Sequence, residues 1–259
     1  MMRTTPAPPR RALDVAGGIA LDAGYALWRQ AASIAQGRVG ETTVHAAEGV
    51  PGGESAITGK ADVAVLIPGI YEPAGFMDPL RRRLQAQGRR VVVLPELGYN
   101  RRTIPESAEL AADRLRGLGV SGAVVIAHSK GGLVGKLLMT AYATEGLVSR
   151  MLAIATPFAG ARYSRYAPTK PLRAFYPGHP VLGSLAKNLE ANARIVSVGS
   201  DVDPLIGHST QLEGARNIIL PVTGHFRILA DPGLLAIVDE FVAQQTSGGT
   251  SANTREQAG

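Results

Sequence analysis

Three residues that could act together on an acyl bond occur in the order Ser129, Asp203 and His225. Each follows a run of apolar residues, as expected for side chains at the end of a buried strand. A serine hydroxyl is a weak nucleophile, and a neighbouring imidazole activates it by accepting its proton. A carboxylate beyond the imidazole fixes the tautomer and stabilises the protonated ring. These residue types therefore indicate nucleophilic attack on an acyl group.

The serine lies in "VVIAHSKGGLVGKLL", residues 124–138, where an apolar run turns directly into a helical pattern. Ala127 and Gly131 are small enough for a tight turn between a strand and a helix. The pattern predicts that this turn presents Ser129 as a nucleophile. The alternative is a Ser129 that only caps the helix.

The acid and the base both have competitors nearby. Asp201 precedes Asp203, but the "DPLI" context favours Asp203 as the acid, since a proline suits a turn at a strand exit. His208 competes with His225, which is favoured because it follows a strand and precedes the last helix. His128, beside the serine, is expected to point away from the site and to pack in the interior.

Apolar runs alternate with helical patterns between residues 40 and 245. Predicted strands cover residues 62–69, 90–96, 122–128, 150–157, 194–200 and 216–222, and residues 41–49 could add an edge strand. Predicted helices cover residues 76–88, 105–119, 130–146 and 233–245. This order is typical of an α/β fold with a mostly parallel central sheet covered by helices on both faces. Ligands bind such sheets at the carboxyl ends of the strands, where the serine, acid and histidine fall.

The segment "AHSKGG" resembles the nucleophile elbow G-x-S-x-G of α/β-hydrolase fold lipases and esterases, with Ala127 in place of the first glycine. Similarly, "SDVDPLIGHS" resembles the segment that carries the acid of this family, and "GHFRIL" resembles its histidine loop. The resemblance covers residues 60–245 in element order. It implies the α/β-hydrolase fold, a catalytic triad of Ser129, Asp203 and His225, and no cofactor.

The resemblance also implies two backbone donors for the oxyanion. One is the N–H of Lys130, which follows the nucleophile, and the other is the N–H of Ile70 in "IPGIYEP", after the first predicted strand. Pro68 stands where the family usually has histidine. Tyr71, in the same loop, is expected to contact the substrate.

Residues 158–193 follow the fourth predicted strand, where this fold places its cap. Their length predicts a small cap insertion of one or two short helices over a partly open site. Aromatic residues that could line an acyl groove or simply pack the cap are Phe158, Tyr163, Tyr166, Phe175 and Tyr176. The basic residues of the same segment could attract anionic substrates or an anionic membrane, or could merely be solvated.

The composition excludes several classes of protein. The chain has 259 residues, a net charge of +6 and no cysteine, which excludes disulfides, a cysteine nucleophile and thiolate zinc sites. No two histidines have ligand spacing on one element, so no metal is expected. No nucleic-acid-binding motif accompanies the basic charge, and nucleic acid is not expected as a partner.

Both ends of the chain differ from the middle. Residues 1–39 predict a disordered start followed by an amphipathic helix over residues 12–35, and residues 246–259 predict a disordered tail around the domain 40–245. Asp22 and Arg29 interrupt the apolar pattern of the helix, so neither a membrane span nor a secretion signal is expected. The expected location is cytoplasmic. The helix either packs on the domain surface or makes a peripheral contact with a membrane or partner.

The sequence therefore predicts a hydrolase that acts on a small-molecule or lipid carboxylic ester. An acyltransferase, a thioesterase or an amidase would use the same triad. A non-catalytic binding module of the same fold is the alternative from another class, and an intact triad argues against it.

Overall fold

The central sheet determines which residues meet at the site. The computed structural model describes residues 12–35, 44–45 and 63–250, so the first predicted disordered residues and most of the predicted tail lie outside it. Within these ranges, the strands form one sheet in the order β1-β3-β2-β4-β5-β6-β7. Their bounds are β1 Val44–His45, β2 Val63–Ile67, β3 Arg90–Val93, β4 Ala123–His128, β5 Val148–Ile154, β6 Ile195–Val202 and β7 Arg216–Thr223.

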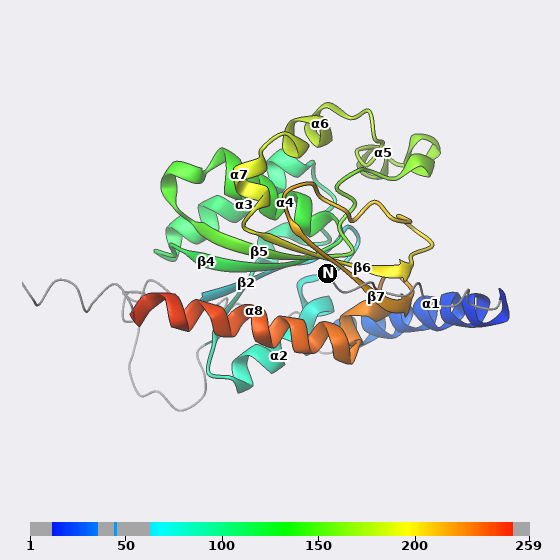
Figure 1. Cartoon of the computed structure of the whole chain (residues 1–259), viewed down its shortest axis with the longest axis horizontal. Helices are drawn as coiled ribbons and strands as arrows, with labels where there is room; N and C mark the ends of the chain where they lie inside the picture. The colour runs from blue at the N-terminus through cyan, green and yellow to red at the C-terminus, as the bar shows by residue number, and fades with distance from the viewer. Residues whose placement is uncertain (1–11, 36–43, 46–62, 251–259) are drawn as a thin grey trace, which may run out of the picture.

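Neighbouring strands from β3 to β7 pair in parallel, and β1 pairs antiparallel with β3. Every residue of β2 and β4 is buried, as expected for strands that helices cover on both sides. Figure 1 shows α3 (Ile104–Gly117) and α4 (Lys130–Ala141) on one face, and α2 (Asp78–Ala86) and α8 (Pro232–Thr250) on the other. The predicted mostly parallel sheet between two layers of helices is confirmed. Helix α8 continues to Thr250, beyond residue 246, where the tail was predicted to begin.

Helix α4 approaches the sheet closely because glycines face it. A Cβ at Gly131 would collide with the carbonyl oxygen of Ile67 and lie 2.8 Å from that of Pro68. The absence of a side chain at this position lets the helix begin immediately after β4, directly beside the loop that follows β2.

The cap contains more helices than predicted. It comprises a 3-10 helix at Arg162–Tyr166 and the short helices α5 (Lys170–Arg173), α6 (Pro180–Ala186) and α7 (Leu189–Asn192). Prolines stand in the first turn of α5 and of α6. Because proline starts helices but cannot continue them, the segment divides into several short helices rather than one or two.

Helix α1 (Ala12–Ala35) packs across β7 and the 3-10 helices Ala74–Met77 and Arg227–Ala230. Two of its charged side chains face the protein. Asp22 and Arg29 are both buried, and the Arg29 guanidinium donates to the carbonyl oxygens of Gly75 (2.5 Å) and Phe76 (2.9 Å). The residues that seemed to interrupt an apolar helix therefore attach it to the domain.

A methyl group at Gly131 should separate α4 from the loop after β2. We expect Gly131→Ala to lower the free energy of unfolding by about 1–3 kcal/mol, as overpacking does. Gly17→Ala is the matched control, because a Cβ there meets nothing within 4 Å. It should raise the free energy of unfolding by up to about 1 kcal/mol through helix propensity alone. Urea titrations of both variants test this, and equal effects would contradict it.

Candidate active site

The structure brings Ser129, His225 and Asp203 into one hydrogen-bonded row at the carboxyl edge of the sheet. Ser129 Oγ lies 3.0 Å from His225 Nε2, and His225 Nδ1 lies 2.8 Å from Asp203 Oδ2. Ionised Asp203 accepts the Nδ1 proton, which leaves Nε2 free to accept the serine proton. The three residues follow three different strands: Ser129 follows β4, Asp203 follows β6 and His225 follows β7.

The carboxylate of Asp203 is held in its charged form. Burial alone would raise the pKa of Asp203. The hydrogen bond and charge of His225, with the N–H groups of Leu205 (2.9 Å) and Ile206 (3.0 Å), outweigh it and lower this pKa. The competing residues Asp201 and His208 are both exposed, and it is Asp203 that contacts the histidine.

Backbone strain gathers at this edge. Among the described residues, the non-glycine residues with positive φ are Tyr71, Asn100, Ser129 and Ala155, which follow β2, β3, β4 and β5. Ser129 has φ 51° and ψ −121°, and its N–H donates to the carbonyl of Ile154 (2.8 Å). Such conformations persist only where surrounding contacts enforce them. The strain places the serine hydroxyl above the sheet rather than in the ladder.

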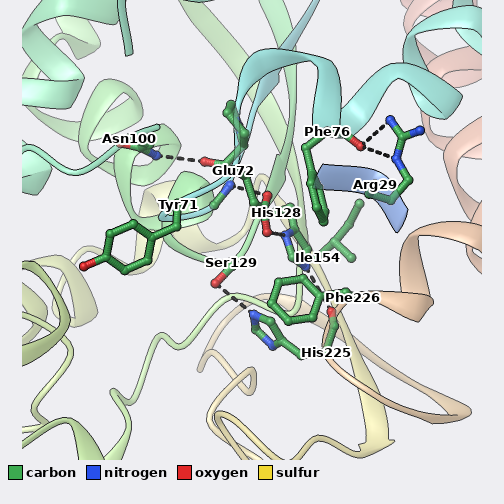
Figure 2. A network of polar contacts seen from close by, with 12 residues as sticks. Arg29, Tyr71, Glu72, Phe76, Asn100, His128, Ser129, Ile154, His225 and Phe226 are labelled. Carbon is green, nitrogen blue, oxygen red and sulfur yellow. Dashed lines mark hydrogen bonds and ion pairs between the residues drawn. The ribbon is translucent and has the colours of Figure 1, made fainter. Parts of the chain in front are cut away.

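His128 points away from the serine, as expected, but it does more than pack. Figure 2 shows its ring between Glu72 and the backbone of His225. Nδ1 lies 2.8 Å from Glu72 Oε1, and Nε2 lies 3.0 Å from the carbonyl oxygen of His225. Burial alone would lower the pKa of His128, but the charge and hydrogen bond of Glu72 and the carbonyl of His225 raise it. Both ring nitrogens face acceptors, so the geometry favours an imidazolium that donates from each.

The other carboxylate oxygen of Glu72 reaches the loop after β2. Its Oε2 accepts from the N–H of Gly69 at 2.6 Å. The N–H of Tyr71 donates to Tyr99 (2.7 Å), and that of Glu72 donates to Gly69 (3.4 Å). Ile70 is therefore the residue of this turn whose N–H makes no hydrogen bond to another described residue.

Lys130 supports the loop after β2 indirectly, through Asn100 in the loop after β3. Its buried ammonium donates to the carbonyl oxygens of Asn100 (2.7 Å) and Arg102 (2.5 Å) and to Asn100 Oδ1 (2.9 Å). The Asn100 amide in turn donates to the carbonyl oxygen of Pro68 at 2.8 Å, a contact drawn in Figure 2. Burial lowers the pKa of Lys130 to about 7. The side chain is thus directed away from Ser129, and only the backbone of Lys130 is next to the nucleophile.

Helix α1 holds the histidine loop. The carboxylate of Asp22 accepts the backbone N–H groups of His225 (2.9 Å), Phe226 (2.7 Å) and Arg227 (2.7 Å). This approach needs a glycine, since Gly224 has φ 134° and a Cβ there would collide with the carboxylate. Asp22 is therefore part of the framework that positions the histidine.

The arrangement can be compared with known proteins. No protein-family model matches the sequence, and no curated protein sequence is significantly similar to it. A lipase of Bacillus licheniformis in its mature form is similar in structure, at 12% identity and a TM-score of 0.59 over 77% of this chain and 97% of that one. A structure from a study of carboxylesterases of Nitrososphaera gargenis has 15% identity and a TM-score of 0.56 over 73% and 92%. An enol-lactonase of Burkholderia xenovorans has 14% identity and a TM-score of 0.51 over 71% and 92%.

The chain has the α/β-hydrolase fold. At these identities the similarity concerns the fold alone, and the order of the strands and the strained serine after β4 agree with it.

A cavity of about 480 Å³ opens beside the serine of this α/β-hydrolase fold. Ser129 and His225 line it together with the loop after β2, the cap and the inner side of α1. Most of its remaining lining is apolar and includes Ile70, Phe76, Pro157, Leu172, Phe175, Leu205, Ile206 and Phe226. The shape and lining suit an apolar chain whose polar end meets the serine.

Only some of the residues predicted to contact the substrate line the cavity. Tyr71 and Tyr166 line the cavity, and the Tyr71 hydroxyl also lies 3.0 Å from Thr169 Oγ1 in the cap. Phe158 was predicted as a contact but does not line the cavity, because its ring packs under the Lys136 ammonium at 5.5 Å. The side chain of Tyr163 lies outside the described part of the chain.

Sequence reasoning missed Glu72, Asn100 and Asp22. Of these, Asp22 left a signal, because Asp22 and Arg29 are seven residues apart and so lie on one side of a helix. Glu72 and Asn100 stand in loops without a motif, and only the fold shows their partners. Within the described residues, no cluster of three or more acidic or histidine side chains could hold a metal ion.

The buried pair of Glu72 and His128 should make stability depend on pH. The folded pKa of His128 is raised, so its contribution is complete below the unfolded value of about 6.5 and is lost as the pH rises through the folded value. Glu72→Gln should cost about 3–5 kcal/mol in acid and progressively less at higher pH. Urea titrations of wild type and variant over this pH range measure the difference. Glu109→Gln, at an exposed site, is the control, and a pH-independent difference would contradict the prediction.

Proposed function

We propose that this chain is a serine hydrolase that cleaves carboxylic esters through an acyl-enzyme on Ser129. The observation that carries the proposal is the row of hydrogen bonds from Ser129 through His225 to Asp203, at 3.0 Å and 2.8 Å. It lies in the wall of an apolar cavity, at a serine whose backbone is strained into the turn between β4 and α4. The lipase and the carboxylesterase study among the similar structures support the same class of reaction.

The reaction would take two steps. Ser129 Oγ attacks the acyl carbon while His225 Nε2 takes the hydroxyl proton, and Asp203 stabilises the resulting imidazolium. The tetrahedral intermediate then loses its alkoxide, which leaves as an alcohol with the proton from His225. Water attacks the acyl-enzyme with His225 again as the base, and the products are a carboxylic acid and free Ser129.

The N–H groups of Ile70 and Lys130 would bind the oxyanion. The N–H of Lys130 is at the first turn of α4, where no intrahelical acceptor exists. The N–H of Ile70 stands in a turn whose neighbouring N–H groups are all occupied. Two such fixed donors stabilise charge that develops on the substrate oxygen, and each is worth about 10²–10³ in kcat.

The apolar lining of the cavity favours a substrate with an apolar acyl group. An acyltransferase or a thioesterase would need the same triad, and so would an amidase. A distortion of the oxyanion hole by Lys130 or Pro68 would favour the binding-module alternative. Instead, the Lys130 side chain points away and Asn100 anchors the carbonyl of Pro68, which supports a working site.

Intact mass after treatment with a fluorophosphonate tests the nucleophile. We expect one adduct on the wild type and none on Ser129→Ala, because only a serine with an adjacent base reacts with this reagent. Asp203→Asn should keep the fold but lower kcat on an aryl ester about 10⁴-fold. The matched controls are Asp201→Asn and His208→Ala at the two competing positions, which should keep both labelling and turnover. A folded wild type that forms no adduct would overturn the proposal.

The acyl chain should fit the cavity. Each methylene that moves from water into an apolar cavity contributes about 0.8 kcal/mol, so kcat/KM should rise about fourfold per methylene until the cavity is full. A series of aryl esters from acetate upward measures this dependence. Leu172→Gln, which places an amide in the cavity wall, should flatten the rise and leave acetate turnover nearly unchanged. A kcat/KM that is highest for acetate would contradict an acyl-binding cavity.

A further inference from the structure

Helix α1 exposes apolar side chains along the face that points away from the protein. Leu13 is 85% exposed, Leu21 62%, Leu27 72% and Trp28 58%. The small residues between them on this side include Gly17 and Ala20, and both are exposed. At 100° per residue these positions fall on one side of the helix. The outward face of α1 is therefore apolar over most of its length.

This arrangement reverses the usual one. A surface helix normally buries its apolar side and presents charged residues to solvent. In α1 the buried side carries Asp22 and Arg29, which bind the histidine loop and the carbonyls after β2, while the apolar side is left outward. Contiguous exposed apolar surface indicates a binding surface.

Helix α1 also forms part of the cavity wall, on a different side from its outward face. Ala26 and Gln30 of α1 line the cavity, and Tyr166 and Leu172 of the cap line it from the opposite side. Figure 1 shows α1 and the cap segment around α5 at the same end of the molecule. Tyr166 is 82% exposed, so it stands at the rim. Helix α1 and the cap rim therefore stand on two sides of the same cavity, at one end of the molecule.

The rim on the cap side is cationic. Residues 161–187 contain Arg162, Arg165, Lys170, Arg173 and Lys187 and no acidic residue. Arg165, Lys170 and Arg173 are exposed. The apolar face and the cavity mouth are thus accompanied by positive charge.

We propose that the outer face of α1 and the cationic cap dock on a lipid surface that contains anionic phospholipid. The helix would lie in the plane of the interface, with its apolar face among the acyl chains and the cap cations near the headgroups. The described helices include none with the length and hydropathy to cross a bilayer. On the basis of the proposed function, the docked cavity would receive an ester directly from the membrane.

A second copy of the chain is the competing occupant. It would cover the apolar face equally well, but it carries the same cationic cap as the first copy. Anionic lipid supplies both an apolar phase and the opposite charge. Charge complementarity therefore favours lipid over self-association.

Trp28 is the only tryptophan of the chain and reports on this face directly. The full-length Ser129→Ala protein, which cannot hydrolyse lipid, is mixed with vesicles of phosphatidylcholine, with or without phosphatidylglycerol. We expect a blue shift of Trp28 emission and co-flotation with the anionic vesicles, and weaker binding as salt is raised above about 0.15 M. Absence of both effects on anionic vesicles would overturn the proposal.

Neutral substitutions separate apolar contact from charge. Leu21→Gln with Leu27→Gln should weaken vesicle binding at least about tenfold, and Leu189→Gln, at an exposed leucine of α7, should not change it. Arg165→Gln and Lys170→Gln should each weaken binding to anionic vesicles about fivefold. Equal loss at Leu189 would contradict the assigned surface.

Two further measurements distinguish lipid docking from dimerisation and from the proposed hydrolase activity. Sedimentation of the lipid-free protein detects a dimer, and a dimer that Leu21→Gln and Leu27→Gln dissolve would assign the face to a second copy instead. In the catalytically intact protein, the same two substitutions should leave fluorophosphonate labelling and turnover of a soluble short-chain ester unchanged. Lipid binding without labelling would disprove the proposed hydrolase but not the docking.

Discussion

The buried pair of Glu72 and His128 is the interaction on which the site depends. The carboxylate binds the N–H of Gly69 in the loop after β2, and the imidazolium binds the carbonyl of His225 in the loop after β7. Because His128 directly precedes Ser129 in the chain, this pair connects the nucleophile strand to both other loops. A buried ion pair is favourable only when its remaining polar atoms are satisfied. Here the geometry satisfies them with the loops that the site must fix.

Helix α1 also fixes loops of the site through buried polar contacts. An active site at one edge of a sheet must hold several loops that no strand ladder supports. Asp22 supplies three acceptor contacts to the histidine loop, and Gln30 donates to the carbonyl of Tyr71 at 2.7 Å. The helix is therefore part of the framework that holds the loops of the candidate site. Asp22, Arg29 and Gln30 make their contacts on the inward side of the helix, and exposed leucines and Trp28 occupy its outward side.

The sequence was sufficient for the sheet and for the three residues at its edge. Fully apolar runs of strand length determine a parallel sheet, and in such a sheet Ser129, Asp203 and His225 have few other places to lie. Their distances could not be predicted, because these depend on contacts between loops far apart in the chain. Glu72 and Asn100 show this most clearly, since each joins segments that share no local pattern. For Phe158 the sequence left open whether the ring lines the cavity or packs elsewhere, because its position in a loop does not determine which way the ring points.

The residues with strained backbone conformations are also held by hydrogen bonds. Tyr71, Asn100 and Ser129 each hold a backbone conformation that an unconstrained chain would leave. Each also makes a hydrogen bond that holds its backbone. The N–H of Tyr71 donates to the carbonyl oxygen of Tyr99, and the N–H of Ser129 donates to that of Ile154. The carbonyl oxygen of Asn100 accepts from the ammonium of Lys130. These hydrogen bonds thus come from residues that surround the candidate site. A loop relaxed at one of these residues would move an N–H or a hydroxyl out of the site, so the fold stores its strain where position matters most.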